Sequence, residues 1–190
     1  MRTNNLKNNL GQNFNGVHII YPNIFEDERG YFYESFNKNI FNKQFGEINF
    51  VQENHSFSTE SVLRGLHFQV PPHGQGKLVE CISGSIIDVV VDLRKNSKTF
   101  LTWGSIELSE NNHKQLWIEK GFAHGFYTLS KNAHLIYKID NYWNKNAERS
   151  IIWNDPSIGI IWPQTSNSPI ISEKDLIGMR IDQFDNKELF

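Results

Sequence analysis

The chain is divided into many short β-type segments, and no long helical period runs through it. The segments are rich in Val, Ile, Phe and Tyr, and most are bounded by Gly, Asn, Pro or Ser. Short strands that alternate with turn residues are typical of β-sandwiches and closed barrels. The pattern predicts an all-β fold, and its segments read VHIIYP, GYFYESF, INFVQENHSF, VLRGLHFQ, KLVECISGSIIDVVVDLR, TFLTWGSIELS, KQLWIEKG, GFYTLS and AHLIYKIDNYW.

Length and composition favour one folded domain. A chain of 190 residues can bury one sizeable core without disulfides, and 13% aromatic residues are too many to leave in water. Residues 1–16 differ from the rest, because they hold six asparagines and little apolar surface. We therefore expect a flexible leader over 1–16 and a single domain over 17–190.

Local signals predict two short helices and one hairpin. Asn37 can cap a helix that ends at Gly46, and residues 172–175 (SEKD) resemble a capping box that opens a second helix. Residues 77–92 consist of two apolar runs around Ser-Gly-Ser, which predicts a β-hairpin.

Charge and cysteine usage exclude several kinds of partner and compartment. The chain has 19 Lys and Arg against 21 Asp and Glu, and a net charge of −2 does not favour binding to nucleic acids or acidic membranes. No apolar stretch reaches 18 residues and the N-terminus lacks a signal-peptide core. The single cysteine, Cys81, cannot form an internal disulfide. We expect a cytoplasmic protein with no nucleic-acid or membrane partner.

The segment Leu63–Gln69, LRGLHFQ, places a permanent cation and a titratable ring in an apolar run. In a regular strand Arg64 and His67 would point to opposite faces, because they are three residues apart. Gly65 lies between them, where a bulge could bring both to one side. The alternative is an outward Arg64 with a hydrogen-bonded core His67.

A second histidine segment, GFAHGF, brackets His124 with glycines that leave room for close approach. With the region that follows His67, it resembles the two signature regions of the cupin jelly rolls. Cupins often bind a metal through His-x-His, but the partner position here is Gln69. A metal site built from His67, His73 and His124 stays open as an alternative.

Further polar residues could stabilise an anion or deliver a proton. The candidate cations are Arg29, Arg64, Lys77 and Lys174, and Tyr137 offers a phenol on a predicted strand. The alternative is that these are solvated charges and a half-buried core tyrosine. Dinucleotide, P-loop and Gly-x-Ser-x-Gly motifs do not occur, so hydride transfer and nucleotide hydrolysis lack support.

Longer motifs make a family resemblance specific. Over about residues 20–175 the chain resembles the dTDP-4-dehydrorhamnose 3,5-epimerases, which are metal-independent cupin jelly rolls (double-stranded β-helices) that use no cofactor. The matching segments, in family order, are FEDERGYFYESFN, FVQENHS, VLRGLHFQ, QGKLVE, IIDVVVDLRKNS, KGFAHGF, LIYKIDNYW and WNDPSIGIIWP.

The resemblance implies a reaction and a catalytic set. Such enzymes invert both carbons beside the ketone of dTDP-4-keto-6-deoxy-D-glucose and give dTDP-4-keto-L-rhamnose. His67 matches the family base, Asp175 the carboxylate that orients it, and Tyr137 the acid. Arg64 and Lys77 match the cations that stabilise the charge on the ketone oxygen.

The resemblance also implies a nucleotide site and a homodimer with N-terminal strand exchange. Arg29 and Glu34 match residues that the family supplies from the partner subunit. Trp143 stands where the family usually stacks a tyrosine on thymine. The remaining matches to substrate-binding residues are Gln52, Asn54, His124, Glu148 and Lys174, together with Arg64 and Lys77.

Three other functions remain open at this point. The nearest is an epimerase that acts at one carbon only, since the acid and base would be the same. The others are a non-catalytic sugar-nucleotide binding cupin and a metal-dependent cupin oxygenase. Because His67, Tyr137 and Asp175 are all present, we expect catalysis.

Overall fold

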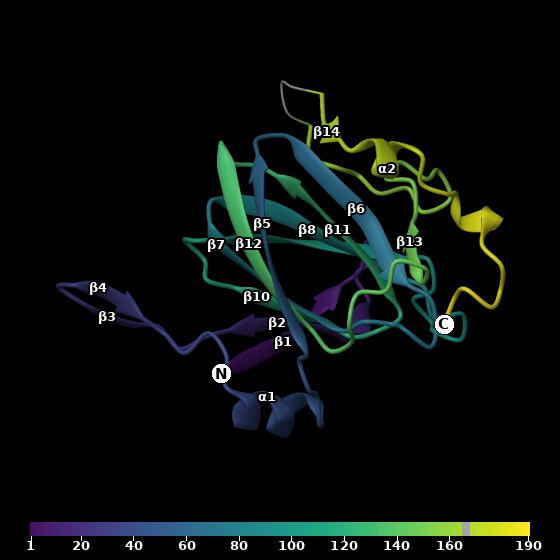
Figure 1. The fold of residues 1–190 in the computed structure, drawn as a ribbon. Coiled ribbons are helices and arrows are strands. Elements are labelled where there is room, and N and C mark those ends of the chain that lie inside the picture. Colours follow the sequence, from purple (N-terminus) through teal and green to yellow (C-terminus); the bar gives the residue numbers. More distant parts are fainter. Residues whose placement is uncertain (165–167) are drawn as a thin grey trace.

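Two antiparallel sheets face each other and form the body of the molecule (Figure 1). The computed structural model describes residues 1–164 and 168–190. The first sheet, sheet 1, has the strand order β1 (Arg2–Lys7), β2 (Asn13–Tyr21), β10 (Gln115–Ile118), β7 (Lys77–Ser83), β12 (Asn132–Ile139) and β5 (Gln52–Thr59). The second, sheet 2, has the order β13 (Glu148–Ser150), β6 (Val62–Gln69), β11 (Phe122–Thr128), β8 (Ser85–Asp92) and β9 (Trp103–Ser109), with β14 (Ile170–Ile171) parallel to β6.

This arrangement confirms the all-β jelly roll but corrects the predicted hairpin. Strand β7 pairs with β10 and β12 in sheet 1, whereas β8 pairs with β9 and β11 in sheet 2. Gly84, at φ +76°, turns the chain from one sheet to the other. A short glycine turn between two apolar runs therefore joins the two layers here instead of pairing neighbouring strands.

The predicted flexible leader over residues 1–16 is wrong. Strand β1 pairs with β2 from Arg2 opposite Tyr21 to Lys7 opposite Asn13. Leu6 and Phe14 are buried in the core between the sheets. The asparagine-rich composition concealed these strands, because only two apolar side chains are needed to anchor them.

The core between the sheets is built from the inward residues of both layers. Its fully buried members include Phe14, Val79, Val90, Leu116 and Leu135. A second cluster lies on the other side of sheet 2, beneath the C-terminal segment. Sheet 2 is therefore packed on both faces, which fixes the strands that carry the two histidine segments.

Helix α1 (Lys38–Phe45) covers part of the outer face of sheet 1, where Phe41 packs edge-on to Trp117 at a ring separation of 5.2 Å. The Asn37 side chain accepts hydrogen bonds from the first turn and Gly46 ends the helix, as predicted. In the part of the chain that the structure describes, no helix has the length and apolar character needed to span a membrane.

The remaining elements lie outside the two sheets. Helix α2 (Glu173–Leu176) is a single turn capped by the Ser172 hydroxyl, which confirms the predicted start, and the short 3₁₀ helix η1 (Ile181–Gln183) follows it. Strands β3 (Phe25–Asp27) and β4 (Gly30–Phe32) pair only with each other within the described residues and project away from the body (Figure 1). We call residues 25–32 the arm.

Candidate active site

A cavity of about 120 Å³ opens between β5, β6, β7 and β12. It gathers many of the residues predicted from the sequence, including the imidazole of His67, the phenol of Tyr137 and the ammonium group of Lys77. The residues that line it are Gln52, Asn54, His67, Phe68, Gln69, Gln75, Lys77, Tyr137, Ile139, Trp143 and Glu148.

His67 on β6 is paired with Asp175 on α2. The Nε2 atom of His67 lies 2.6 Å from the Asp175 Oδ1 atom, and the carboxylate also accepts a hydrogen bond from the Gly65 amide at 3.3 Å. Burial alone would raise the pKa of Asp175, but the hydrogen bond and charge of His67 lower it below its ordinary value. The ionised Asp175 accepts the Nε2–H and leaves the His67 Nδ1 lone pair free to accept a proton.

A bulge in β6 brings Arg64 and His67 to the same face. His67 lies opposite His124 on β11, and Arg64 lies opposite Phe126, so three residues of β6 span two of β11. Because residues two apart on a strand share a face, the extra residue removes the mismatch that spacing alone predicts.

Gly65 makes this bulge possible. It adopts φ +112°, and a Cβ atom there would lie 2.6 Å from the Cα atom of Gly125 on β11. Both the backbone conformation and the close approach require glycine. The backbone therefore has the bulge that a shared face requires, while the Arg64 side chain itself is exposed and does not line the pocket.

Lys77 points from β7 into the same pocket beside two acidic groups. Burial lowers the pKa of Lys77 to about 8, while the charges of Asp88 and Glu148 act in the opposite direction. Asp88 lies on β8, is fully buried, and contacts the His124 Nε2 atom at 2.9 and 3.0 Å. Sequence analysis missed Asp88, although a lone carboxylate in the run IIDVVV was a signal.

Tyr137 lines the pocket from β12, and Arg64 lies near it. Burial raises the pKa of Tyr137, and the charge of Arg64 opposes that rise in part. The guanidinium of Arg64 is held by the Ser58 hydroxyl and the Phe57 carbonyl, each at 3.0 Å. The phenol is therefore protonated at neutral pH and available as a proton donor.

Several polar side chains lie near Trp143 at the open end of the pocket. The Gln52 Oε1 atom accepts a hydrogen bond from the Trp143 amide at 3.3 Å, and the Gln52 Nε2 atom donates to the Asn54 Oδ1 atom at 2.8 Å. Lys174 pairs with Glu148 at 2.7 Å. The Trp143 indole is more than half exposed, so one of its faces is open to a planar ligand.

Comparison with known proteins identifies the family. The family model described as dTDP-4-dehydrorhamnose 3,5-epimerase matches residues 12–183. The chain belongs to the dTDP-4-dehydrorhamnose 3,5-epimerase family. Relatives of that name from Shigella flexneri and Salmonella typhimurium are 50% and 51% identical, over 86% and 88% of this chain and 90% and 91% of their own lengths.

Solved structures in the same fold include two different activities. A 3,5-epimerase from Legionella pneumophila in complex with dTDP-4-keto-L-rhamnose aligns with a TM-score of 0.90 at 40% identity, covering 99% of this chain and 97% of its own. A 3'-monoepimerase from Streptomyces bikiniensis in complex with dTDP-quinovose aligns with a TM-score of 0.83 at 30% identity, covering 88% and 84%. The cupin-type jelly roll predicted for this family member is confirmed.

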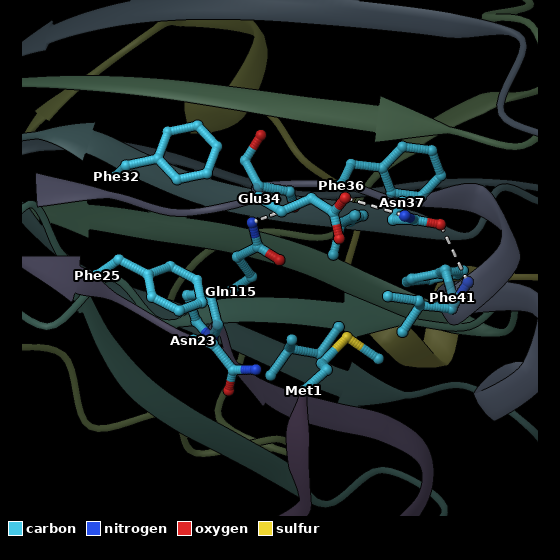
Figure 2. A pocket seen from close by; sticks show the side chains of 14 residues that line it. Met1, Asn23, Phe25, Phe32, Glu34, Phe36, Asn37, Phe41 and Gln115 are labelled. Atoms are coloured by element: carbon cyan, nitrogen blue, oxygen red, sulfur yellow. Dashed lines mark hydrogen bonds between the residues drawn. The ribbon is translucent and has the colours of Figure 1, made fainter.

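Six residues predicted from the epimerase resemblance do not line this pocket. Four of them lie close to residues that do or to their strands: Asp175 bonds to His67, Lys174 pairs with Glu148, Arg64 lies near Tyr137, and His124 lies opposite His67. The other two, Arg29 and Glu34, lie on or beside the arm. Arg29 sits on the arm, 85% exposed, and is paired with Asp27. Glu34 follows the arm and accepts a hydrogen bond from the Asn37 Nδ2 atom at 2.9 Å. Glu34 instead lines a larger cavity of about 290 Å³ beside the arm (Figure 2), which contains none of the predicted catalytic residues.

The alternative metal site from His67, His73 and His124 does not form in this epimerase fold. His67 and His124 each bind a carboxylate, and His73 is not among the pocket residues. Among residues 1–164 and 168–190, no group of three or more His, Cys, Asp and Glu side chains is arranged to hold a metal ion. Gln69, at the second cupin ligand position, holds the His73 carbonyl and the Asn144 amide instead.

Proposed function

We propose that this pocket inverts both carbons beside the ketone of dTDP-4-keto-6-deoxy-D-glucose and releases dTDP-4-keto-L-rhamnose. The observation that carries the proposal is that His67 from β6, Tyr137 from β12 and the cation of Lys77 from β7 line one pocket. A base, an acid and a cation are what two proton transfers next to a carbonyl require. No cofactor takes part in this chemistry.

The first step is removal of a proton from a carbon next to the ketone. The proton goes to the His67 Nδ1 atom, and the electron pair of the C–H bond moves towards the ketone oxygen. Asp175 stabilises the imidazolium that forms, since its carboxylate lies 2.6 Å from the Nε2 atom. General base catalysis of this kind contributes about 10²–10⁴-fold in rate.

The negative charge on the ketone oxygen needs a fixed partner. Lys77 supplies it, with Arg64 near the phenol on the same side of the barrel. A well-placed donor in a site of this kind is worth about 3–4 kcal/mol in the transition state. The buried charge of Asp88 keeps the Lys77 ammonium group protonated against the effect of burial.

Inversion is completed by Tyr137. The phenol delivers a proton to the face of the sugar opposite to the one from which His67 removed it, and the enolate returns to a ketone. Exchange with water then removes the proton from His67 and returns one to Tyr137. Because the ketone lies between the two carbons, the restored groups can act on the second carbon after the sugar shifts in the pocket.

The nucleotide is bound at the open end of the pocket, and two copies of the chain complete the site. Trp143 stacks on the base, while Gln52, Asn54, Glu148 and Lys174 contact the nucleotide and its diphosphate. The His124 ring, whose side chain is 10% exposed, adds only an edge contact to this set. Arg29 and Glu34 reach the site of the partner subunit. The arm, which pairs with neither sheet of its own chain among the described residues, is the N-terminal element exchanged in this homodimer.

A reducing cytoplasm suits Cys81, which is free and buried.

Incubation with dTDP-4-keto-6-deoxy-D-glucose in heavy water tests the function. We expect deuterium at both carbons beside the ketone and the L-rhamno product by NMR. Deuterium at one carbon would indicate the activity named for the S. bikiniensis neighbour, and no deuterium would indicate a binding protein. Stoichiometric iron, manganese or zinc in the purified protein would favour the oxygenase instead.

A further inference from the structure

We propose that Glu80 is a positioning residue that fixes the base of the arm on the outer face of sheet 1. The base of the arm is defined as residues 33–36, which follow β4. Through it, Glu80 would set where Arg29 and Glu34 lie relative to the body. The inference rests on the proposed role of the arm in the partner's nucleotide site.

Glu80 is a buried carboxylate that bridges two donors from different parts of the chain. Its side chain leaves β7 on the side opposite to Lys77, because the two residues are three positions apart on a strand. Only 4% of Glu80 is exposed. Its Oε1 atom accepts a hydrogen bond from the Tyr33 hydroxyl, and its Oε2 atom accepts one from the Gln115 Nε2 atom at 2.9 Å.

The same network holds the backbone of the segment. The Gln115 Nε2 atom also donates to the Ser35 carbonyl at 2.7 Å, and Figure 2 shows this amide pointing at the chain beside Glu34. Tyr33 and Ser35 therefore tie the residues on both sides of Glu34 to sheet 1. The ring of His113, on the loop before β10, packs against Tyr33 at 5.4 Å and adds a side contact.

Beyond its base, the arm contacts the body through Tyr31, whose ring lies 4.6 Å from the His113 ring. Its two strands pair only with each other within the described residues, and a two-stranded hairpin is marginally stable alone. Phe25 and Phe32 are largely exposed. The orientation of the arm relative to the body therefore depends on the residues at its base and on the contact between Tyr31 and His113.

A carboxylate is well suited to this position. It offers two acceptor oxygens to two donors, and a side chain of the same length without acceptors would remove the partner of the Tyr33 hydroxyl and of one N–H of the buried Gln115 amide. Burial and the charge of Glu80 raise the pKa of Tyr33, so its hydroxyl remains a donor at all physiological pH values. Glutamine could keep both bonds, because its amide can donate to the tyrosine oxygen and accept from Gln115.

The test uses full-length Glu80→Met, with Glu80→Gln as the conservative variant and Glu107→Met as the matched control on an exposed strand position. We expect Glu80→Met to raise KM for the dTDP-keto sugar about tenfold with kcat within about twofold. It should also speed deuterium uptake by the amides of residues 25–36. Glu80→Gln and Glu107→Met should match the parent protein in both measurements.

Three outcomes would overturn the proposal. They are an unchanged KM in Glu80→Met, a fall in kcat at constant KM, and unchanged deuterium uptake over residues 25–36. If Glu80→Met does not fold, Tyr33→Phe removes one of the bonds and should shift KM in the same direction by a smaller factor. If the parent protein has no epimerase activity, the proposed function fails, while the deuterium uptake still decides the role of Glu80.

Discussion

Two histidine–carboxylate pairs lie side by side in the barrel and differ in access to the pocket. His67 and His124 are directly opposite each other on β6 and β11. The His67 side chain is 28% exposed and bonded to Asp175, whereas the His124 side chain is 10% exposed and bonded to Asp88. The same two functional groups thus occur once where a ligand can reach the ring and once where the ring is enclosed.

Because of this difference, the open pair is suited to proton transfer and the enclosed pair to holding a fixed charge. The open pair can exchange a proton with a substrate, because His67 lines the pocket. The enclosed pair places the negative charge of Asp88 where it raises the pKa of Lys77. Identical chemistry at two neighbouring positions therefore has different uses, and burial decides which.

The largest expected effect comes from breaking the open pair. Asp175→Asn removes the carboxylate charge and leaves one acceptor oxygen for two donors, the His67 Nε2–H and the Gly65 amide, so kcat should fall about 10²–10⁴-fold, with dTDP affinity changed little. In the enclosed pair, Asp88→Asn should lower kcat at pH 7 about tenfold or less and cost about 1–3 kcal/mol of unfolding free energy. Steady-state kinetics and chemical denaturation measure both. Equal losses of kcat in the two variants would abolish the distinction.

The second effect concerns the acid on the far side of the pocket. Tyr137→Phe removes the proton donor and leaves the His67–Asp175 pair intact. Product formation should fall about 10²-fold, while washout of substrate deuterium into solvent continues. NMR of the substrate pool follows washout and inversion together. Parallel loss of both, in a variant that still binds dTDP, would remove Tyr137 from the reprotonation step.

The third effect is a pH dependence that comes from Lys77 and is shifted by the Asp88 charge of the enclosed pair. Because the pKa of Lys77 is about 8, kcat/KM should fall towards tenfold per pH unit above that value. Asp88→Asn removes a charge that raises this pKa, so the decline should begin at lower pH. Between about 8 and 10.5 the unfolded chain binds more protons at Lys77, so this group's contribution to stability rises with pH. Activity that declines only together with the fold would contradict the assignment to Lys77.

The smallest effect is expected at the enclosed ring. His124→Gln keeps a hydrogen bond to Asp88 and changes only a residue of the proposed nucleotide contact set. KM should rise about three- to tenfold and kcat should stay within about threefold. Loss of kcat as large as in Asp175→Asn would mean that the enclosed pair also moves protons.

Short-range signals in the sequence predicted most of the local structure. The cap at Asn37 and the helix end at Gly46 were predicted from residues adjacent in sequence, and the structure confirms them. A bulge at Gly65 was one of two alternatives, and the structure has it. The turn at Gly84 was predicted as well, but its role as a connection between the two sheets was not. The same Ser-Gly-Ser turn could close a hairpin or cross between layers, and pairing partners elsewhere in the chain decided it.

Contacts between residues far apart in the sequence could not be predicted from residue spacing. Asp175 lies 108 residues from His67, and only the family resemblance linked them before the structure placed them together. Asp88 lies 36 residues from His124 and was overlooked, because spacing gave no sign that this carboxylate pairs with the histidine. Glu80 and Tyr33 are 47 residues apart, so their contact also depends on the fold rather than on any local pattern.

The central claim is that the open imidazole of His67 removes the substrate proton. The most direct measurement is the rate of deuterium incorporation from heavy water into the dTDP-keto sugar by the parent protein and by His67→Asn, with dTDP affinity measured for both. We predict incorporation at both carbons by the parent and a loss of at least about 10²-fold in the variant, with affinity nearly unchanged. Incorporation at the parent rate in a folded His67→Asn protein would contradict the account.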